Sequence, residues 1–235
     1  MLGTLVNTGA VLVGSTVGVL LKRRFPPRVQ EVAMQAVGAV TLLIGLQMGL
    51  AADSGRKIIV VLLSLAGGAI VGELLDIQGG LDRLGQRLER RFARPGNDQF
   101  ARAFVTASLL FCVGPMTILG SLQDGLQGDA TLLFTKAVLD GISSTAIAAS
   151  LGFGTTFAAG TVFFYQGALT VAAGGLREVM TPPVVQAVTA TGGLMIACLA
   201  VNIWGLATLR VANMLPGLFL AGLLAWTLER AAPLF

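Results

Sequence analysis

The sequence predicts an all-α protein, a polytopic membrane helix bundle of about eight spans. Of its 235 residues, 54% are hydrophobic and only 12% are charged, whereas roughly 25% charged residues are typical of a soluble domain. Several uncharged stretches reach the roughly 20 residues that a helix needs to cross a bilayer. Because lipid cannot satisfy open backbone groups and no alternating strand pattern occurs, we expect helices to form every span.

Uncharged runs locate these spans along the chain. One long run holds two helices, because Leu151-Gly-Phe-Gly154 predicts a hairpin turn inside it. The eight expected spans are 1–21, 32–52, 58–72, 103–123, 131–151, 157–176, 179–209 and 211–228. Cys112-Val-Gly-Pro115 predicts a break in the fourth span, and Asn213-Met-Leu-Pro-Gly217 predicts one in the last.

The stretch 77–102 has a different character. Leu81, Leu84, Leu88 and Phe92 recur at helical spacing, and arginines occupy the other face. This pattern predicts an amphipathic helix in the membrane interface that ends at Pro95-Gly-Asn-Asp98. We expect its arginines to rest on anionic headgroups rather than to form a dedicated partner site.

Basic residues predict the orientation of the chain. They gather in the segments 22–28 and 83–102, which we therefore expect in the cytoplasm. Both termini and the 124–129 loop then face outward. No basic segment precedes the first apolar run, so we expect it to remain as a helix rather than to be cleaved as a signal peptide.

An internal repeat divides the single membrane domain, 1–235, into four parts. Small, polar and turn-forming residues recur at offsets of about 155 to 158 residues. The first copies are Gly3-Thr4, Gly9-Ala10, Pro26-Pro27, Gly38 and Gln47, and their counterparts are Gly160-Thr161, Gly167-Ala168, Pro182-Pro183, Gly193 and Asn202. The parts are a first repeat (1–76), a cytoplasmic amphipathic connector (77–102), a central helix pair (103–152) and a second repeat (157–235). Span six comes five spans after span one, an odd offset, so we expect the repeats to be inverted, as is typical of secondary transporters.

Glycines four residues apart predict close helix packing. Gly14 and Gly18, Gly45 and Gly49, and Gly68 and Gly72 form three such pairs. They favour a compact bundle and leave open a homodimer that shares one of these faces.

Two charges fall inside the fifth expected span. Lys136 and Asp140 lie four residues apart on one helix face, and each charge costs about 2.5 to 3.5 kcal/mol at mid-membrane. Asp140 lies nine residues into the span, about 14 Å deep. Ser143 and Ser144 add hydroxyls that would replace hydration water around a cation or polar solute. We interpret this face as a candidate pathway for an ion or solute. The alternative is that Lys136 and Asp140 form a salt bridge with a purely structural role.

Other polar residues complete the candidate pathway. Asp124 and Asp129 lie at the expected external end, where we interpret them as hydrated mouth or turn residues rather than buried acids. Glu73 lies near the cytoplasmic end of the third span, from which its side chain can reach water. The uncharged members are Gln47, Gln123, Gln166 and Asn202, with Asn7 and Asn213 as further hydrogen-bonding groups. Each alone is a common interhelical contact.

Composition excludes several classes of chemistry. The chain has no histidine, and Cys112 and Cys198 sit alone in apolar runs. We therefore expect no metal site, no cofactor and no Cys–His nucleophile. The partners we expect are the lipid bilayer and a small solute or cation, with no nucleic acid.

The central motifs resemble a known bacterial family. They are Cys112-Val-Gly-Pro-Met-Thr-Ile-Leu-Gly-Ser-Leu-Gln-Asp-Gly125, Lys136-Ala-Val-Leu-Asp-Gly141, Tyr165-Gln-Gly167 and Gly3-Thr-Leu-Val-Asn7. Together they resemble the domain-of-unknown-function 554 family, the YqgA/YdfK-like bacterial inner-membrane proteins. The resemblance spans nearly the whole chain and implies a multi-pass protein of the bacterial inner membrane. It implies no substrate.

The leading hypothesis is a small secondary transporter of an ion or small polar solute, with Asp140 binding a cation or proton. The alternatives are a passive ion channel and a non-transporting scaffold or sensor that uses the arginine-rich helix. We do not expect an enzyme. Asp124-Gly125 and Asp140-Gly141 resemble paired catalytic carboxylates, but their expected depths in the membrane differ.

Overall fold

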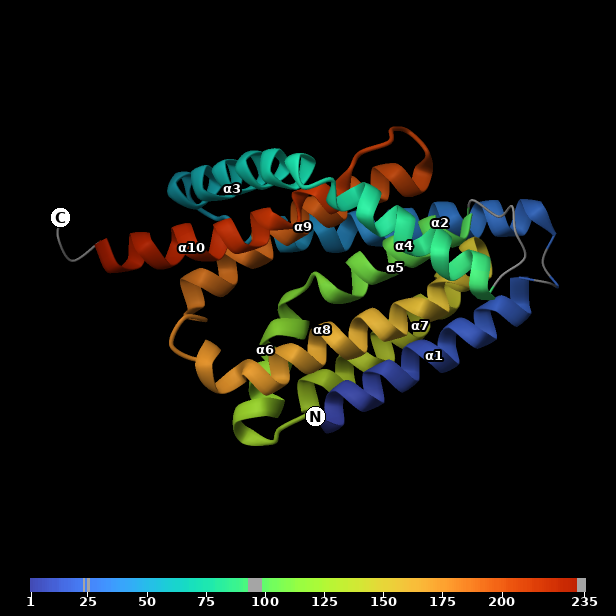
Figure 1. The fold of residues 1–235 in the computed structure, drawn as a ribbon, viewed down its shortest axis with the longest axis horizontal. Coiled ribbons are helices and arrows are strands. Elements are labelled where there is room, and N and C mark those ends of the chain that lie inside the picture. Colours follow the sequence, from blue (N-terminus) through green and yellow to red (C-terminus); the bar gives the residue numbers. More distant parts are fainter. Residues whose placement is uncertain (23, 25, 93–98, 232–235) are drawn as a thin grey trace.

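Ten α-helices and one short 3-10 helix form the part of the chain that the structure, a computed structural model, describes: residues 1–22, 24, 26–92 and 99–231 (Figure 1). The α-helices are α1 (Leu2–Lys22), α2 (Pro27–Gly49), α3 (Gly55–Leu74), α4 (Ile77–Phe92), α5 (Gln99–Cys112), α6 (Pro115–Gln127), α7 (Thr131–Leu151), α8 (Gly154–Leu176), α9 (Pro182–Trp204) and α10 (Pro216–Ala231). The 3-10 helix, η1, covers Val211–Met214. The all-α fold class is confirmed.

Seven segments are long and apolar enough to cross a membrane: α1, α2, α3, α7, α8, α9, and η1 together with α10. The pair α5 and α6 makes an eighth span when it is counted as one, and its two helices meet at a bend of 59°. The bend lies between Cys112 and Pro115, and the break before α10 lies between Met214 and Pro216. Both breaks that the sequence predicts are therefore present.

Prolines and glycines set most helix boundaries. Pro27 and Pro182 begin α2 and α9, where the missing N–H removes no helical hydrogen bond. Gly152 joins α7 to α8 with a φ of +99°, which side chains rarely adopt. One expected extent is wrong: the span 179–209 ends early, because α9 stops at Trp204 and residues 205–210 form a loop.

Five of the six glycines in the predicted pairs lie where helix backbones approach closely, whereas Gly49 faces the Leu194 side chain. A Cβ on Gly14 or Gly18 would overlap backbone atoms of α7, and one on Gly45 would overlap the backbone of α9. A Cβ on Gly68 or Gly72 would overlap the backbone at Gly217 or Asn213. Small residues therefore fix three helix contacts, and the close packing expected of them is confirmed.

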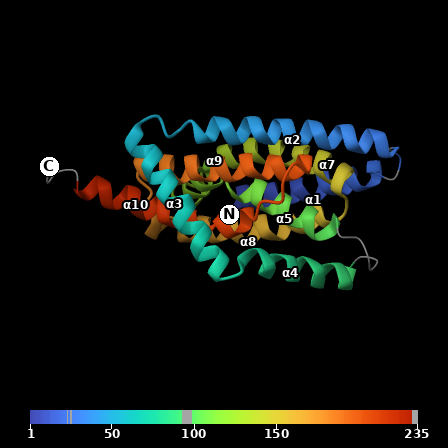
Figure 2. The ribbon, with the colours of Figure 1, turned by 90° about the horizontal axis from the view of Figure 1, so that it is seen from above.

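Each helix of the first triplet packs against one helix of the last. Thr4 and Asn7 of α1 contact Thr170 and Gln166 of α8, so these two helices run antiparallel. The pairs α2 with α9 and α3 with α10 also lie side by side (Figures 1 and 2). An inverted repeat would produce these three contacts, and the inversion itself stays a prediction.

The amphipathic connector helix is present as α4. It packs along α5, with Gly85 close to Ala101, so it lies beside the bundle rather than apart from it (Figure 2). Its Arg83, Arg87 and Arg90 are exposed, and the arginine face expected from the sequence is therefore outward. The turn expected at residues 95–98 lies outside the described residues.

Candidate functional site

A buried ion pair lies midway along α7. Lys136 and Asp140 are one helical turn apart, and the Lys136 ammonium donates to Asp140 Oδ2. The two side chains are only 7% and 11% exposed. Neither charge faces lipid, because α1 packs along the same face of α7. The i,i+4 pairing expected from the sequence is therefore formed inside the bundle.

Two neighbouring helices hold this pair with amide groups. Asn7 Nδ2 on α1 donates to Asp140 Oδ2 at 3.0 Å and lies 2.9 Å from Gln166 Oε1 on α8. Gln166 Nε2 in turn lies 3.4 Å from Thr4 Oγ1, and Thr4 Oγ1 lies 3.4 Å from Thr170 Oγ1. We call these six side chains the Asp140 network: Thr4, Asn7, Lys136, Asp140, Gln166 and Thr170. It joins three helices far apart in the sequence.

One acceptor in this network is unsatisfied. Among the residues described, Asn7 Oδ1 finds no hydrogen-bond partner, although Asn7 is fully buried. Most buried polar atoms in proteins do find one. An oxygen of this kind next to a carboxylate can bind a cation, a proton donor or a water molecule.

Asp124 departs from the expectation for the external end. Its side chain is only 3% exposed, so it is a buried acid and not a hydrated mouth residue. Oδ2 lies 2.9 Å from the Met1 backbone nitrogen and 3.2 Å from that of Gly3. The first turn of α1 covers it, an arrangement that composition alone does not specify.

Asp129, by contrast, is an exposed turn residue, as expected. Its Oδ1 accepts a hydrogen bond of 3.0 Å from the Thr131 N–H at the start of α7. The side-chain and backbone hydrogen bonds of Thr131 lower the pKa of Asp129 below its ordinary value. Asp129 therefore satisfies the first backbone N–H of α7.

The break between α5 and α6 lies close to the ion pair. Cys112, the last residue of α5, is within electrostatic range of both Lys136 and Asp140. Thr117 Oγ1 donates to the Phe111 carbonyl at 3.1 Å, which satisfies one backbone group that the break leaves open. A cavity of about 10 Å³ adjoins Cys112, Gly114 and Tyr165, and this volume holds roughly one water.

The remaining predicted residues divide between two regions. Ser144 is buried on α7 near Asp140, where its hydroxyl donates to the Gly141 carbonyl at 2.9 Å, and Ser143 is half-buried. Gln123 is half-buried on α6, whereas Gln47 is exposed on α2. The structure therefore places Ser144 and Gln166 near Asp140 and leaves Gln47 on the outer surface.

Glu73 and Asn202 belong to a second polar region at the ends of α3 and α9. Glu73 pairs with Arg210 and accepts a hydrogen bond of 2.6 Å from Asn213 Nδ2. The Asn202 side chain bonds the Leu209 N–H and carbonyl, both at 2.7 Å, and so closes the 205–210 loop. Neither residue belongs to the Asp140 network.

Sequence reasoning missed Thr4 and Thr170 and named Asn7 only as a further hydrogen-bonding group beside the candidate pathway. Thr4, Asn7, Val11 and Ser15 form one buried face of α1, at helical spacing. This spacing is the sequence signal that places Thr4 on the same helix face as Asn7. Among the described residues no three His, Cys, Asp or Glu side chains converge as metal ligands would.

Comparisons with known proteins agree on a family. A family model described as "Protein of unknown function (DUF554)" matches residues 2–226. The uncharacterized membrane protein YdfK of Bacillus subtilis is 29% identical over 221 residues, 94% of this chain and 93% of the relative. The uncharacterized protein YqgA of Escherichia coli is 29% identical over 234 residues, 97% of this chain and 98% of the relative. No solved structure matches the chain significantly.

Proposed function

The chain belongs to the DUF554 family of proteins of unknown function, and from that premise we propose, on the strength of its own residues, that it is a small secondary transporter of an ion or small polar solute. In this proposal Asp140 binds the transported cation or a coupling proton. The membrane is the bacterial inner membrane, with both termini outside. The observation that carries the proposal is the buried Lys136–Asp140 pair, which Asn7 and Gln166 hold from two other helices.

Charges inside a membrane bundle are costly, and their usual positions are ion or substrate pathways. Two buried charges cost roughly 5 to 7 kcal/mol on the insertion scale, which is more than one polar contact returns. If the pair served only to hold the helices together, well-packed apolar side chains would stabilise the bundle as much. The cost therefore favours a functional pair over a structural one.

The pair also supports a mechanism of exchange. In the empty carrier the Lys136 ammonium occupies Asp140 as a tethered cation. An arriving cation takes its place on Asp140 Oδ2, and the unsatisfied Asn7 Oδ1 supplies a second oxygen. Separation of α1 and α8 from α7 would open the site, because these helices close over it.

Two features of the fold support transport. Secondary transporters commonly place broken helices at a midplane site between inverted repeats. Here the α5–α6 break lies near the ion pair, and the first and last helix triplets pack as three neighbouring pairs. Rocking of one triplet against the other is the motion we propose.

The test is cation- or pH-dependent flux in proteoliposomes. We expect Asp140→Asn to abolish coupled flux, while Asp129→Asn, in an exposed turn, retains it. Because Asp140→Asn leaves Lys136 buried without its partner, the double variant Lys136→Met/Asp140→Asn separates loss of fold from loss of function. It should recover monodispersity in gel filtration and still carry no flux. Unchanged flux in Asp140→Asn would overturn the proposal.

The same measurements separate the alternatives. Single-channel currents far above carrier turnover would assign a channel, and the absence of flux in every wild-type preparation would favour a scaffold or sensor. We propose no enzyme. Asp124 bonds the α1 backbone at Gly3, whereas Asp140 bonds the Asn7 side chain. Gly3 and Asn7 are about 6 Å apart along α1, so the two carboxylates bond to different turns of that helix.

A further inference from the structure

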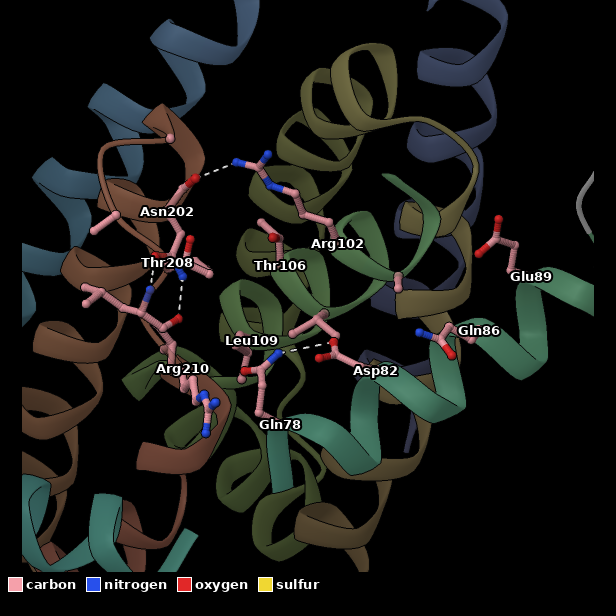
Figure 3. Close-up of a pocket in the computed structure, with 17 residues that line it drawn as sticks. Gln78, Asp82, Gln86, Glu89, Arg102, Thr106, Leu109, Asn202, Thr208 and Arg210 are labelled. Carbon is pink, nitrogen blue, oxygen red and sulfur yellow. Dashed lines mark hydrogen bonds between the residues drawn. The ribbon is translucent and has the colours of Figure 1, made fainter. Parts of the chain in front are cut away.

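A second site lies away from the Asp140 network, in a partly open cavity of about 530 Å³ between α4, α5 and the 205–210 loop (Figure 3). Its volume falls within the range of sites for small ligands, about 300 to 1,000 Å³. Positive-inside counting places this end of the bundle in the cytoplasm. Neither the Lys136–Asp140 pair nor the α5–α6 break contributes to its walls.

One wall of the cavity is acidic and comes from α4. Gln78, Asp82, Gln86 and Glu89 line it and recur at helical spacing. Gln78 Nε2 donates to Asp82 Oδ1 at 3.2 Å, which orients the carboxylate. Because that bond uses Oδ1, Oδ2 remains to accept a hydrogen bond from a ligand cation.

The facing wall carries an anchored arginine. Arg102 Nη2 donates to the Asn202 carbonyl and, at 3.2 Å, to the Ile203 carbonyl at the end of α9. These bonds hold the guanidinium in place, and its Nε and Nη1 groups take no part in them. Nε and Nη1 are not adjacent donors, but each can donate a charge-assisted hydrogen bond to a ligand carboxylate.

Two hydroxyls and an apolar floor complete the cavity. Thr106 lies between Arg102 and Leu109 along α5 and is 4% exposed, and Thr208 faces it from the loop (Figure 3). The apolar lining residues are Val105, Leu109, Leu199 and Val211. Arg210, at the edge, is already paired with Glu73. Glu89, on the acidic wall, already has an interaction partner. The charges that we assign to a ligand are therefore the Asp82 carboxylate and the Arg102 guanidinium.

We propose that this cavity binds a small zwitterion with an apolar body, the chemical class of an apolar amino acid. The ligand ammonium bonds Asp82, the ligand carboxylate bonds Arg102, and the apolar body lies against Val105 and Leu109. A ligand with a single charge forms only one of these two charge-assisted contacts. This site is independent of the proposed ion pathway at Asp140.

The experiment is calorimetric titration of the full-length protein in nanodiscs with three matched probes. L-leucine carries both charges, 3-methylbutylamine lacks the carboxylate and 4-methylpentanoate lacks the ammonium. We expect L-leucine to bind at least about tenfold more tightly than either single-charge probe. Equal affinities, or no heat with L-leucine and with L-phenylalanine, would overturn the proposal.

Variants test the two charged walls separately. Asp82→Asn should weaken L-leucine binding about tenfold and remove the preference of the protein for L-leucine over 4-methylpentanoate. Arg102→Lys keeps the charge but loses the planar guanidinium that the Asn202 and Ile203 carbonyls hold in place, so it should weaken carboxylate binding while the protein stays folded. Arg87→Gln is the matched control, because Arg87 is exposed on α4 and does not line the cavity.

A last variant separates this proposal from the transport proposal. Lys136→Met/Asp140→Asn should bind L-leucine like the wild type, because those residues lie outside the cavity. Loss of L-leucine binding in that variant would contradict a separate site. If this variant still binds L-leucine and also shows unchanged cation flux, the zwitterion site is supported and the proposed ion pathway at Asp140 is contradicted.

Discussion

At the scale of single residues, the Lys136–Asp140 pair is the most informative feature of the chain. Its energetics are asymmetric, because an ion pair offsets the desolvation of both partners, whereas removal of one partner leaves the other charge buried and uncompensated. Asn7 adds to this asymmetry, since its Nδ2 group donates to the same carboxylate oxygen as Lys136. Stability measurements should reveal this coupling.

We predict that Lys136→Met alone lowers the free energy of unfolding by about 3 to 5 kcal/mol, the usual cost of breaking a buried ion pair. The double variant Lys136→Met/Asp140→Leu should lose less than Lys136→Met alone, since it buries no unpaired charge. Thermal unfolding in detergent measures both, with Lys57→Met in an exposed pair as the control. If the double variant loses as much unfolding free energy as Lys136→Met alone, or more, the coupling between the two charges is contradicted.

At the scale of helices, contacts between small residues decide which elements pack together. The α1–α7 contact is the most extensive in the bundle, and it places Gly14 and Gly18 against the α7 backbone. The same contact positions Asn7 beside Asp140. Helix packing and site geometry therefore depend on the same glycines.

Two glycines of α1 provide a matched test of this dependence. A Cβ at Gly14 would overlap the Gly141 carbonyl, whereas Gly9 has open space around it. We predict that Gly14→Ala lowers the free energy of unfolding by about 1 to 3 kcal/mol, as overpacking does. Gly9→Ala should be neutral or should stabilise by up to about 1 kcal/mol, because alanine favours helix. Equal melting temperatures for the two variants would contradict close packing at Gly14.

At the scale of the whole molecule, polar groups gather in two separate regions. The Asp140 network lies among α1, α7 and α8, and the cavity that we propose binds a zwitterion lies between α4, α5 and the 205–210 loop. The positive-inside rule predicts that the cavity end faces the cytoplasm. The orientation of the chain therefore decides which compartment reaches each region.

Cysteine accessibility in intact cells tests this orientation. In a Cys112→Ala/Cys198→Ala background, we predict that Asp53→Cys reacts with a membrane-impermeant maleimide from outside. Arg24→Cys and Arg87→Cys should react only after the membrane is permeabilised, because the positive-inside rule places them in the cytoplasm. All three positions are exposed in the bundle. Labelling of Arg24→Cys in intact cells would reverse the proposed topology.

Local properties of the chain predict the fold class, the breaks and, apart from the end of the span 179–209, the spans. Hydropathy over about 20 residues sets a span, and Pro115 and Pro216 interrupt helices wherever they occur. The i,i+4 contact of Lys136 with Asp140 is equally local, since one helix contains both residues. Helical periodicity likewise identified α4.

Only the tertiary structure decided which side chains meet across helices. Asn7 and Gln166 reach Asp140 because α1 and α8 pack against α7 in one register, and composition carries no such register. Asp124 is buried because the first turn of α1 covers it. Asn202 closes a loop because α9 ends at Trp204 and the next residue, Gly205, has a φ of +72° that turns the chain back. Contacts between distant segments depend on how the helices pack, and local patterns in the sequence do not specify that packing.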